Sequence, residues 1–203
     1  MSIVVIGNFD GVHKGHQQIL NRAKEIAGDE KIVALTFDPH PVSIFAPERT
    51  PTLLTILSDK IELLKIHNAD QVAVIKFTKE FAAMAPEEFV NKVLVEQLKA
   101  TTVIVGQNFT YGFKAAGNVE SLAQHAEFKT IVLDLQSDAE VAISSTRIRS
   151  AIVNGDVESA REMLTRPHRL DGIVVHGEKR GREIGYPTAN LGNIDGQTIP
   201  ADG

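Results

Sequence analysis

Strand-like and helix-like segments alternate along residues 1–150, and this alternation limits the folds that the chain can adopt. Short apolar runs typical of buried strands lie at 3–6, 31–37, 71–77, 101–105 and 130–135. Segments with apolar residues at helical spacing alternate with them, at 17–27, 58–65, 86–99, 119–127 and 145–153. Strands separated by helices predict βαβ units and a parallel sheet with right-handed crossovers. We therefore expect an α/β fold.

End signals support several of these helices. Ser58 is expected to be an N-cap, Pro86 stands at a helix start, and Asn154-Gly155 is expected to close the helix at 145–153. In parallel sheets, ligands bind at the C-terminal edge of the strands. We therefore expect residues 7–16 and 106–117 to lie together at that edge.

The pattern changes after Gly155. A short helix is predicted at 156–164, and residues 170–177 have the pattern of an antiparallel strand. No further helix is predicted, and residues 169–203 bury too little to fold alone, because segments below ~40 residues rarely do so. We expect a first domain at 1–155, a helical linker at 156–168 and the beginning of an all-β domain at 169–203.

Composition argues against several classes of function. The 203 residues carry a formal net charge of −5 and contain no cysteine. A negative charge disfavours binding to nucleic acid, whose phosphates need a positive field. Without cysteine there are no disulfides, zinc–thiolate sites or thiol nucleophiles. No apolar run is long enough to span a bilayer and no signal-like segment begins the chain, so we expect a cytoplasmic protein.

Residues 7–16 form a glycine-rich turn between the first strand and the first helix, and we expect this turn to bind phosphate. N–H groups at a helix start are unpaired and attract anions. Gly15 allows the backbone to approach a ligand closely, and His13 and His16 add side-chain donors aimed at the same place.

Other interpretations of this turn stay open. One alternative is a metal site, because His13 and His16 are three residues apart and His40 could be a third ligand. The other is that the two rings have no ligand and lie in solvent on one face of the helix. The glycine-rich lead-in favours phosphate, because metal sites do not need it. Asp10 either caps the turn or the helix, or orients His13 or helps to hold a hydrated Mg²⁺.

Three later segments also have both a structural and a functional interpretation. Residues 143–149 place several hydroxyls and Arg149 at a helix start, which suits ordinary capping or a polyphosphate site. The loop at 105–112 is a plain connection or, through Asn108, a holder for a planar ring system. Residues 177–190 form a surface hairpin or a nucleotide-binding flap.

With these residues in view, the chain resembles the bacterial bifunctional FAD synthetases, which join a riboflavin kinase to an FMN adenylyltransferase. The matching strings, in family order and spacing, are GNFDGVHKGH, TFDPHP, VGQNFTYG, ISSTRIR and GEKRGREIGYPTANL. The resemblance implies a Rossmann-like nucleotidyltransferase domain followed by the beginning of an all-β riboflavin kinase barrel. It also implies the reaction ATP + FMN → FAD + pyrophosphate, with Mg²⁺.

For the first domain, the resemblance implies a set of site residues. The histidines of the turn would bind ATP phosphates and the developing negative charge, and an arginine would bind the departing pyrophosphate; these catalytic residues are His13, His16 and Arg149. The residues expected to contact ATP are Gly7, Phe9, Asp10, Gly15, Ser145 and Thr146. The residues expected to contact the flavin and its phosphate are Asn108, Pro39, His40 and Pro41. Mg²⁺ would be bound by the phosphates of the substrate.

For residues 169–203, the resemblance implies nucleotide and Mg²⁺ contacts of a riboflavin kinase, at Gly177, Gly181, Arg182, Thr188 and Asn190. Thr188 and Asn190 would be the metal ligands. The family continues through most of a β-barrel that includes its catalytic glutamate, so we expect phosphorylation of riboflavin only in a full-length parent. The partners implied are small molecules, without nucleic acid or membrane, and the oligomeric state is not predicted.

Two alternatives keep part of this interpretation. An adenylyltransferase of the same fold can use pantetheine phosphate or nicotinate mononucleotide as acceptor, although TFDPHP and PTANL argue against this. A non-catalytic flavin or nucleotide sensor is the other alternative. The presence of His13, His16 and Arg149 disfavours it, because a sensor need not keep contacts to a leaving group.

Overall fold

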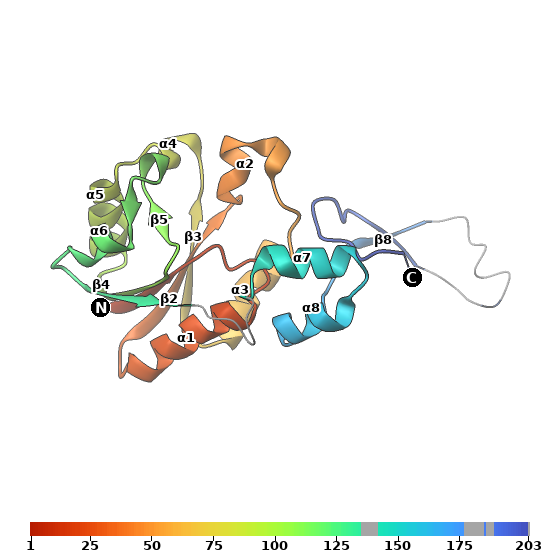
Figure 1. Ribbon diagram of the computed structural model, residues 1–203, viewed down its shortest axis with the longest axis horizontal. Helices are drawn as coiled ribbons and strands as arrows, with labels where there is room; N and C mark the ends of the chain where they lie inside the picture. The colour runs from red at the N-terminus through yellow and green to blue at the C-terminus, as the bar shows by residue number, and fades with distance from the viewer. Residues whose placement is uncertain (135–141, 177–184, 186–188, 203) are drawn as a thin grey trace.

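A five-stranded parallel sheet forms the centre of the computed structural model, which describes residues 1–134, 142–176, 185 and 189–202 (Figure 1). Its order is β3-β2-β1-β4-β7, and each neighbouring pair of strands is parallel. The strands are β1 (Ser2–Ile6), β2 (Lys31–Asp38), β3 (Gln71–Lys76), β4 (Ala100–Gly106) and β7 (Lys129–Leu133). The predicted α/β fold and all of its expected strands are therefore confirmed.

Helices cover both faces of the sheet, which explains why its central strands are apolar throughout. In β1, Ile3 and Val5 belong to one core cluster with α1 (Lys14–Ile26) and α3 (Leu57–Ile66). Val4 and Ile6 belong to a second cluster, packed by α5 (Pro86–Phe89), the π-helix η2 (Val90–Gln97) and α6 (Val119–Ala123). Side chains alternate along a strand, so a strand buried on both faces loses its polar positions.

The strand order places a topological switch between β1 and β4. The chain moves from β1 outward to β2 and β3 on one side, and then returns to β4 and β7 on the other. The loops that follow β1 and β4 therefore begin side by side at the C-terminal edge of the sheet. This is where ligands bind in open α/β sheets, as expected for residues 7–16 and 106–117.

Several element boundaries differ from the predicted ones. The helix expected to have Ser58 as its N-cap begins at Leu57, with Ile56 as a cap that makes no side-chain hydrogen bond. That expectation was wrong because the apolar Leu57 already belongs to the first turn. The helix expected at 86–99 divides into α5 and η2, and α6 ends at Ala123. Shorter elements not predicted are α2 (Pro41–Phe45), η1 (Pro47–Arg49), α4 (Lys79–Ala82), β5 (Thr110–Tyr111), η3 (Phe113–Ala115) and β6 (Gly117–Asn118).

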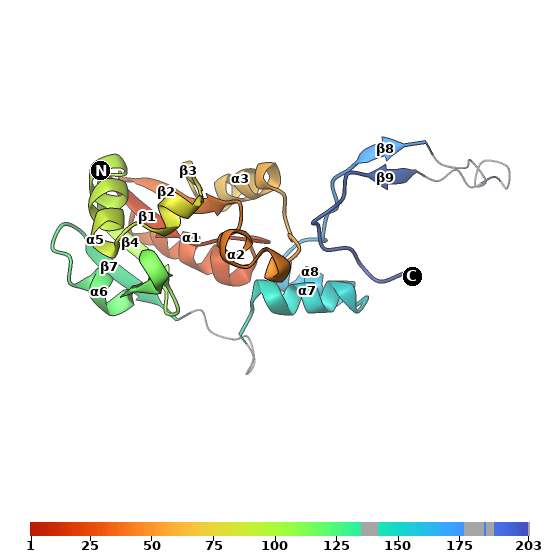
Figure 2. The same ribbon diagram turned by 90° about the horizontal axis from the view of Figure 1, so that it is seen from above.

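The C-terminal part begins with two packed helices, α7 (Ser145–Val153) and α8 (Val157–Leu164). Their apolar residues form a third cluster with Leu54, from the segment before α3. Beyond them, β8 (Ile173–Val175) and β9 (Asn190–Gly192) pair antiparallel, as expected for this region, and extend away from the α/β body (Figure 2). The described segments contain no helix that is long and apolar enough to cross a membrane.

Hydrogen bonds tie the end of the chain back to the α/β body. The Leu53 N–H donates to the Gly196 carbonyl at 2.7 Å, and the Thr198 N–H donates to the Leu53 carbonyl at 2.8 Å. The hydroxyls of Thr52 and Thr198 lie 2.8 Å apart. Residues 196–198 thus form a parallel bridge with the segment before α3. The domain limits at 155 and 168 stay predictions.

Candidate functional site

The turn after β1 ends directly in helix α1, which begins at Lys14 rather than at the predicted Gln17. His13 therefore occupies the N-cap, and His16 lies in the first turn of the helix. His13 makes no side-chain capping bond, and the first turn contains no acidic residue. The unpaired N–H groups and the positive end of the helix dipole are thus left for an anion.

The backbone of this turn is held in a conformation that side chains rarely adopt. Phe9, Gly11 and Val12 have φ values of +50°, +84° and +40°. Phe9 and Val12 are completely buried, so packing holds them in place. A Cβ atom on Gly11 would lie 2.9 Å from Leu54 and 3.1 Å from Leu164. Strain of this kind, fixed by surrounding structure, is common where a site must be preorganised.

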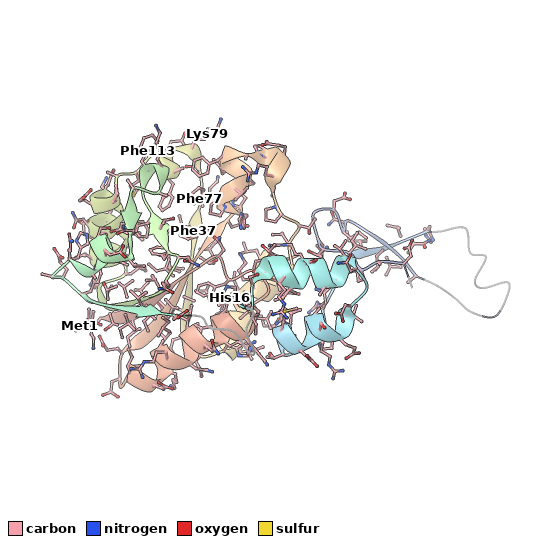
Figure 3. The ribbon with its side chains drawn as sticks, in the orientation of Figure 1. Met1, His16, Phe37, Phe77, Lys79 and Phe113 are labelled. Carbon is pink, nitrogen blue, oxygen red and sulfur yellow. The ribbon has the colours of Figure 1, made fainter. Side chains whose placement is uncertain are left out.

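His13 and His16 stack on each other, with ring centroids 3.7 Å apart and planes inclined by 19° (His16 is labelled in Figure 3). Burial lowers the pKa of His13 to about 4, against an opposing influence from Asp10. Burial, followed by the neighbouring His13, holds the pKa of His16 well below its usual value. Both rings are therefore neutral near pH 7, and each carries one N–H.

Both rings have a buried polar atom without a partner. The Nδ1 atoms of His13 and His16 are shielded from solvent and make no hydrogen bond. Such unpaired groups cost free energy in a folded protein and need an explanation. Within the described ranges no group of three or more His, Asp or Glu side chains is placed to hold a metal. The two histidines are therefore better suited to the polar atoms of a ligand than to a metal shared with His40.

Asp10 is at the centre of a buried polar network. Its carboxylate is 2% exposed and accepts hydrogen bonds from the N–H groups of Leu54, at 3.0 Å, and Thr55, at 3.2 Å. It also pairs with Arg149 Nη2 at 2.5 Å, while Arg149 Nε donates to the Thr52 carbonyl. Asp10 thus caps backbone N–H groups, as one interpretation expected, but those of the 54–55 segment rather than those of its own helix.

The start of α7 and the residues after α8 close around the same turn. The Ser145 hydroxyl donates to the Asp10 carbonyl at 2.8 Å, whereas Thr146 is exposed at the helix start. Arg166 Nη2 donates to the Gly11 carbonyl at 2.7 Å. Sequence analysis missed Arg166, whose only signal was a cation beside Pro167 in the predicted linker. The turn is therefore held by segments that lie more than 130 residues away in the chain.

A cavity of about 540 Å³ opens beside the turn, and aromatic rings form a large part of its lining. Phe77 packs edge-to-face on Phe37 and on Phe81, with centroid distances of 5.6 and 5.5 Å. Figure 3 shows Phe37 and Phe77 between β3 and α2, with Phe113 farther out. Such a cavity suits a flat, apolar ring system.

The predicted flavin residues divide between this cavity and its border. Asn108 and Pro41 line the cavity, whereas Pro39 and His40 do not. His40 Nδ1 accepts from the Val42 N–H, and its Nε2 lies 3.5 Å from the side-chain nitrogen of Asn8. Gly7 and Asn8, from the turn after β1, also line the cavity. The phenylalanines of its wall were not predicted as site residues.

The predicted residues of the second region do not form a described site. Gly177, Gly181, Arg182 and Thr188 lie outside the described residues. Asn190 is exposed and begins β9, where it pairs with Val175.

The fold defines a nucleotidyltransferase-like α/β protein, in which an uncapped helix start lies at the switch point of a parallel sheet. The family model for FAD synthetase matches residues 1–147, and the chain belongs to this family. The family model for riboflavin kinase matches residues 164–203.

Relatives of known name agree with this assignment. The chain is 40% identical over 98% of its length to the bifunctional riboflavin kinase/FMN adenylyltransferase of Listeria monocytogenes, and 35% identical over its full length to that of Bacillus subtilis. It spans 64% and 65% of these relatives. A crystal structure described as a macrolide-efflux protein from Streptococcus pneumoniae matches the whole chain with a TM-score of 0.90 and 34% identity, over 67% of its own length.

Proposed function

We propose that the α/β part of this chain is an FMN adenylyltransferase, which transfers AMP from ATP to FMN and releases pyrophosphate. The observation that carries the proposal is the shared wall of the two subsites. Gly7 and Asn8 line the aromatic cavity and also lead into the helix start at His13. A flat ring in the cavity would therefore present an attached phosphate to the anion site.

The proposed reaction needs alignment rather than a protein nucleophile. An oxygen of the FMN phosphate attacks the α-phosphorus of ATP, and the bond from that phosphorus to the departing pyrophosphate breaks. The FMN phosphate is already ionised near pH 7, so no strong general base is required. Catalysis then rests on positioning and on stabilisation of charge on the phosphoryl oxygens.

The residues of the turn would stabilise that charge. Neutral His13 and His16 would each donate one hydrogen bond to phosphate oxygens, and Gly15 keeps the helix start open. Arg149 would bind the departing pyrophosphate, because a guanidinium has five N–H donors and the bonds to Thr52 and Asp10 use Nε and Nη2. The remaining proposed ATP contacts are Gly7, Phe9, Asp10, Ser145 and Thr146.

The flavin would occupy the aromatic cavity. We propose that Phe77 and Phe81 contact the isoalloxazine ring, and that Asn108 bonds its polar edge. Pro41 lines the cavity, and His40 borders it through Asn8. This arrangement would place the Pro39–Pro41 turn near the ribityl phosphate.

We propose that Mg²⁺ arrives bound to the phosphates of ATP, as part of the substrate. The described residues of the site hold no set of three ligands of the kind that would fix a resident metal. For a full-length parent we propose a second activity, phosphorylation of riboflavin, with Thr188 and Asn190 as Mg²⁺ contacts. Cytoplasmic localisation stays a prediction.

The direct test incubates the chain with FMN, ATP and Mg²⁺ and measures FAD and pyrophosphate. His16→Ala is expected to lower the rate by about 10²-fold, as for loss of one preorganised donor. Folded protein that forms no FAD would contradict the proposal. Thermal shifts with pantetheine phosphate or nicotinate mononucleotide in place of FMN test for another acceptor, and tight binding of FAD without turnover would indicate a sensor.

A further inference from the structure

Lys60 is a buried lysine on the inward face of α3. It is 7% exposed and lies on the same side of the helix as the fully buried Leu64, whereas Lys65 is exposed. An ammonium group loses its hydration on burial, and this cost is large unless a partner replaces the water. Burial accordingly lowers the pKa of Lys60.

The folded chain offers this ammonium no close counter-ion. In the described part of the chain, Lys60 has neither a side-chain hydrogen bond nor a carboxylate within 4.0 Å. The carboxylates whose charges act on it at longer range are Asp10 and Asp38. Asp10 already binds Leu54, Thr55 and Arg149, and Asp38 is exposed to solvent. A positive charge is thus held near the site without an anion beside it.

Lys60 lies in the helix that follows Leu54 and Thr55, the two residues whose N–H groups bind Asp10. The Lys60 N–H donates to the Ile56 carbonyl, one turn after the N–H of Thr55 that binds Asp10. The charge of Lys60 contributes to the lowered pKa of both His16 and His40. His16 lies in the first turn of α1, and His40 borders the cavity through Asn8, so the charge of Lys60 lies within electrostatic reach of both.

We propose that Lys60 binds the phosphate of FMN and holds it against the α-phosphate of ATP. This inference rests on the proposed adenylyl transfer. Two phosphates that react repel each other, and a cation between them offsets that repulsion as they approach. Asp38, whose charge acts on Lys60, ends β2, and Pro41, three residues later, lines the aromatic cavity. Lysine suits this role because its ammonium is a compact charge with three donors.

Flavin fluorescence titration separates the phosphate from the ring. Wild type is expected to bind FMN more tightly than riboflavin, which has the same ring and no phosphate. Lys60→Met is expected to weaken FMN binding by about 10- to 100-fold, the loss expected for one charge-assisted hydrogen bond, and to leave riboflavin binding within about two-fold. Lys65→Met, on the exposed face of the same helix, is expected to match wild type.

The melting temperatures of the variants show whether each one folds, and the binding results separate the role of Lys60 from the proposed adenylyl transfer. Lys60→Met removes the charge from a mostly buried side chain, so its melting temperature is expected to equal or exceed that of wild type. Lys60→Gln serves if the methionine variant does not fold. Unchanged FMN binding, or an equal loss for FMN and riboflavin, would overturn the role of Lys60 while leaving adenylyl transfer standing. Wild-type protein that binds neither flavin would overturn both proposals.

Discussion

Replacing Asp10 by asparagine tests whether its buried carboxylate holds the site together. Asparagine keeps the size of the side chain and one acceptor oxygen, so the bonds from Leu54 and Thr55 can persist in part. The amide has no charge for Arg149, whose side chain is only 14% exposed. Asp10→Asn therefore removes one partner of a mostly buried ion pair and leaves the other in place.

The expected loss of stability is large. Removing one partner of a buried pair costs ~3–5 kcal/mol, and the partial exposure of Arg149 favours the lower end, about 3 kcal/mol. For a chain of this size, 1 kcal/mol corresponds to ~2–4 °C in melting temperature. We therefore expect Asp10→Asn to lower the melting temperature by roughly 6–12 °C.

The measurement is thermal and urea unfolding of Asp10→Asn, Arg149→Met and the double variant. If the pair acts as one unit, the double variant is expected to lose much less than the sum of the two single losses. Asp29→Asn, at an exposed carboxylate, is the matched control and is expected to melt as wild type does. A melting temperature for Asp10→Asn within about 2 °C of wild type would refute this account of the network.

Two further predictions concern the same turn. The folded pKa of His13, about 4, lies below its unfolded value of 6.5, so the unfolded state binds more protons between these values. Urea unfolding is therefore expected to show full stability above pH 6.5 and a loss of about 3 kcal/mol as the pH falls to 4, and a curve that His13→Asn does not flatten would contradict this. Gly11→Ala is expected to destabilise more than Gly28→Ala in the same unfolding assay. Both glycines have positive φ, but only a Cβ at Gly11 would meet Leu54; equal losses would show that the contact does not matter.

Most of the fold could be predicted because its strands are buried on both faces. Runs such as Ile3–Ile6 and Ile32–Leu35 contain no polar residue. In a chain whose strands alternate with helices, such runs indicate strands of a parallel sheet that is covered on both faces. Boundaries were predicted less well. Hydrophobic spacing does not distinguish an α-helix from the π-helix at Val90–Gln97, and it cannot show that His13 is the cap of α1.

The candidate site could be predicted where a local motif or the family resemblance marked its residues, including Pro41 and Asn108, which line the cavity. The turn with His13 and His16 is local, and the family resemblance added Ser145 and Arg149. Phe77 and Phe81 come together with Phe37 only because β2 and β3 are neighbours in the sheet. Lys60 fits an ordinary helical pattern, and nothing in the sequence marks it as buried. These residues depend on tertiary packing, which spacing does not encode.

The bridge between Leu53 and residues 196–198 means that the border between the two family regions in sequence differs from their border in space. Residues 196–198 belong to the segment that matches riboflavin kinase, yet they form backbone hydrogen bonds with Leu53. The next residue, Leu54, donates its N–H to Asp10. Thr52, which contacts Thr198, also accepts the bond from Arg149. Exchange of the riboflavin-kinase-like segment between relatives would therefore also exchange part of the support of Asp10 and Arg149. The two family regions share these hydrogen bonds, so residues 52–55 and 196–198 are expected to change together in evolution.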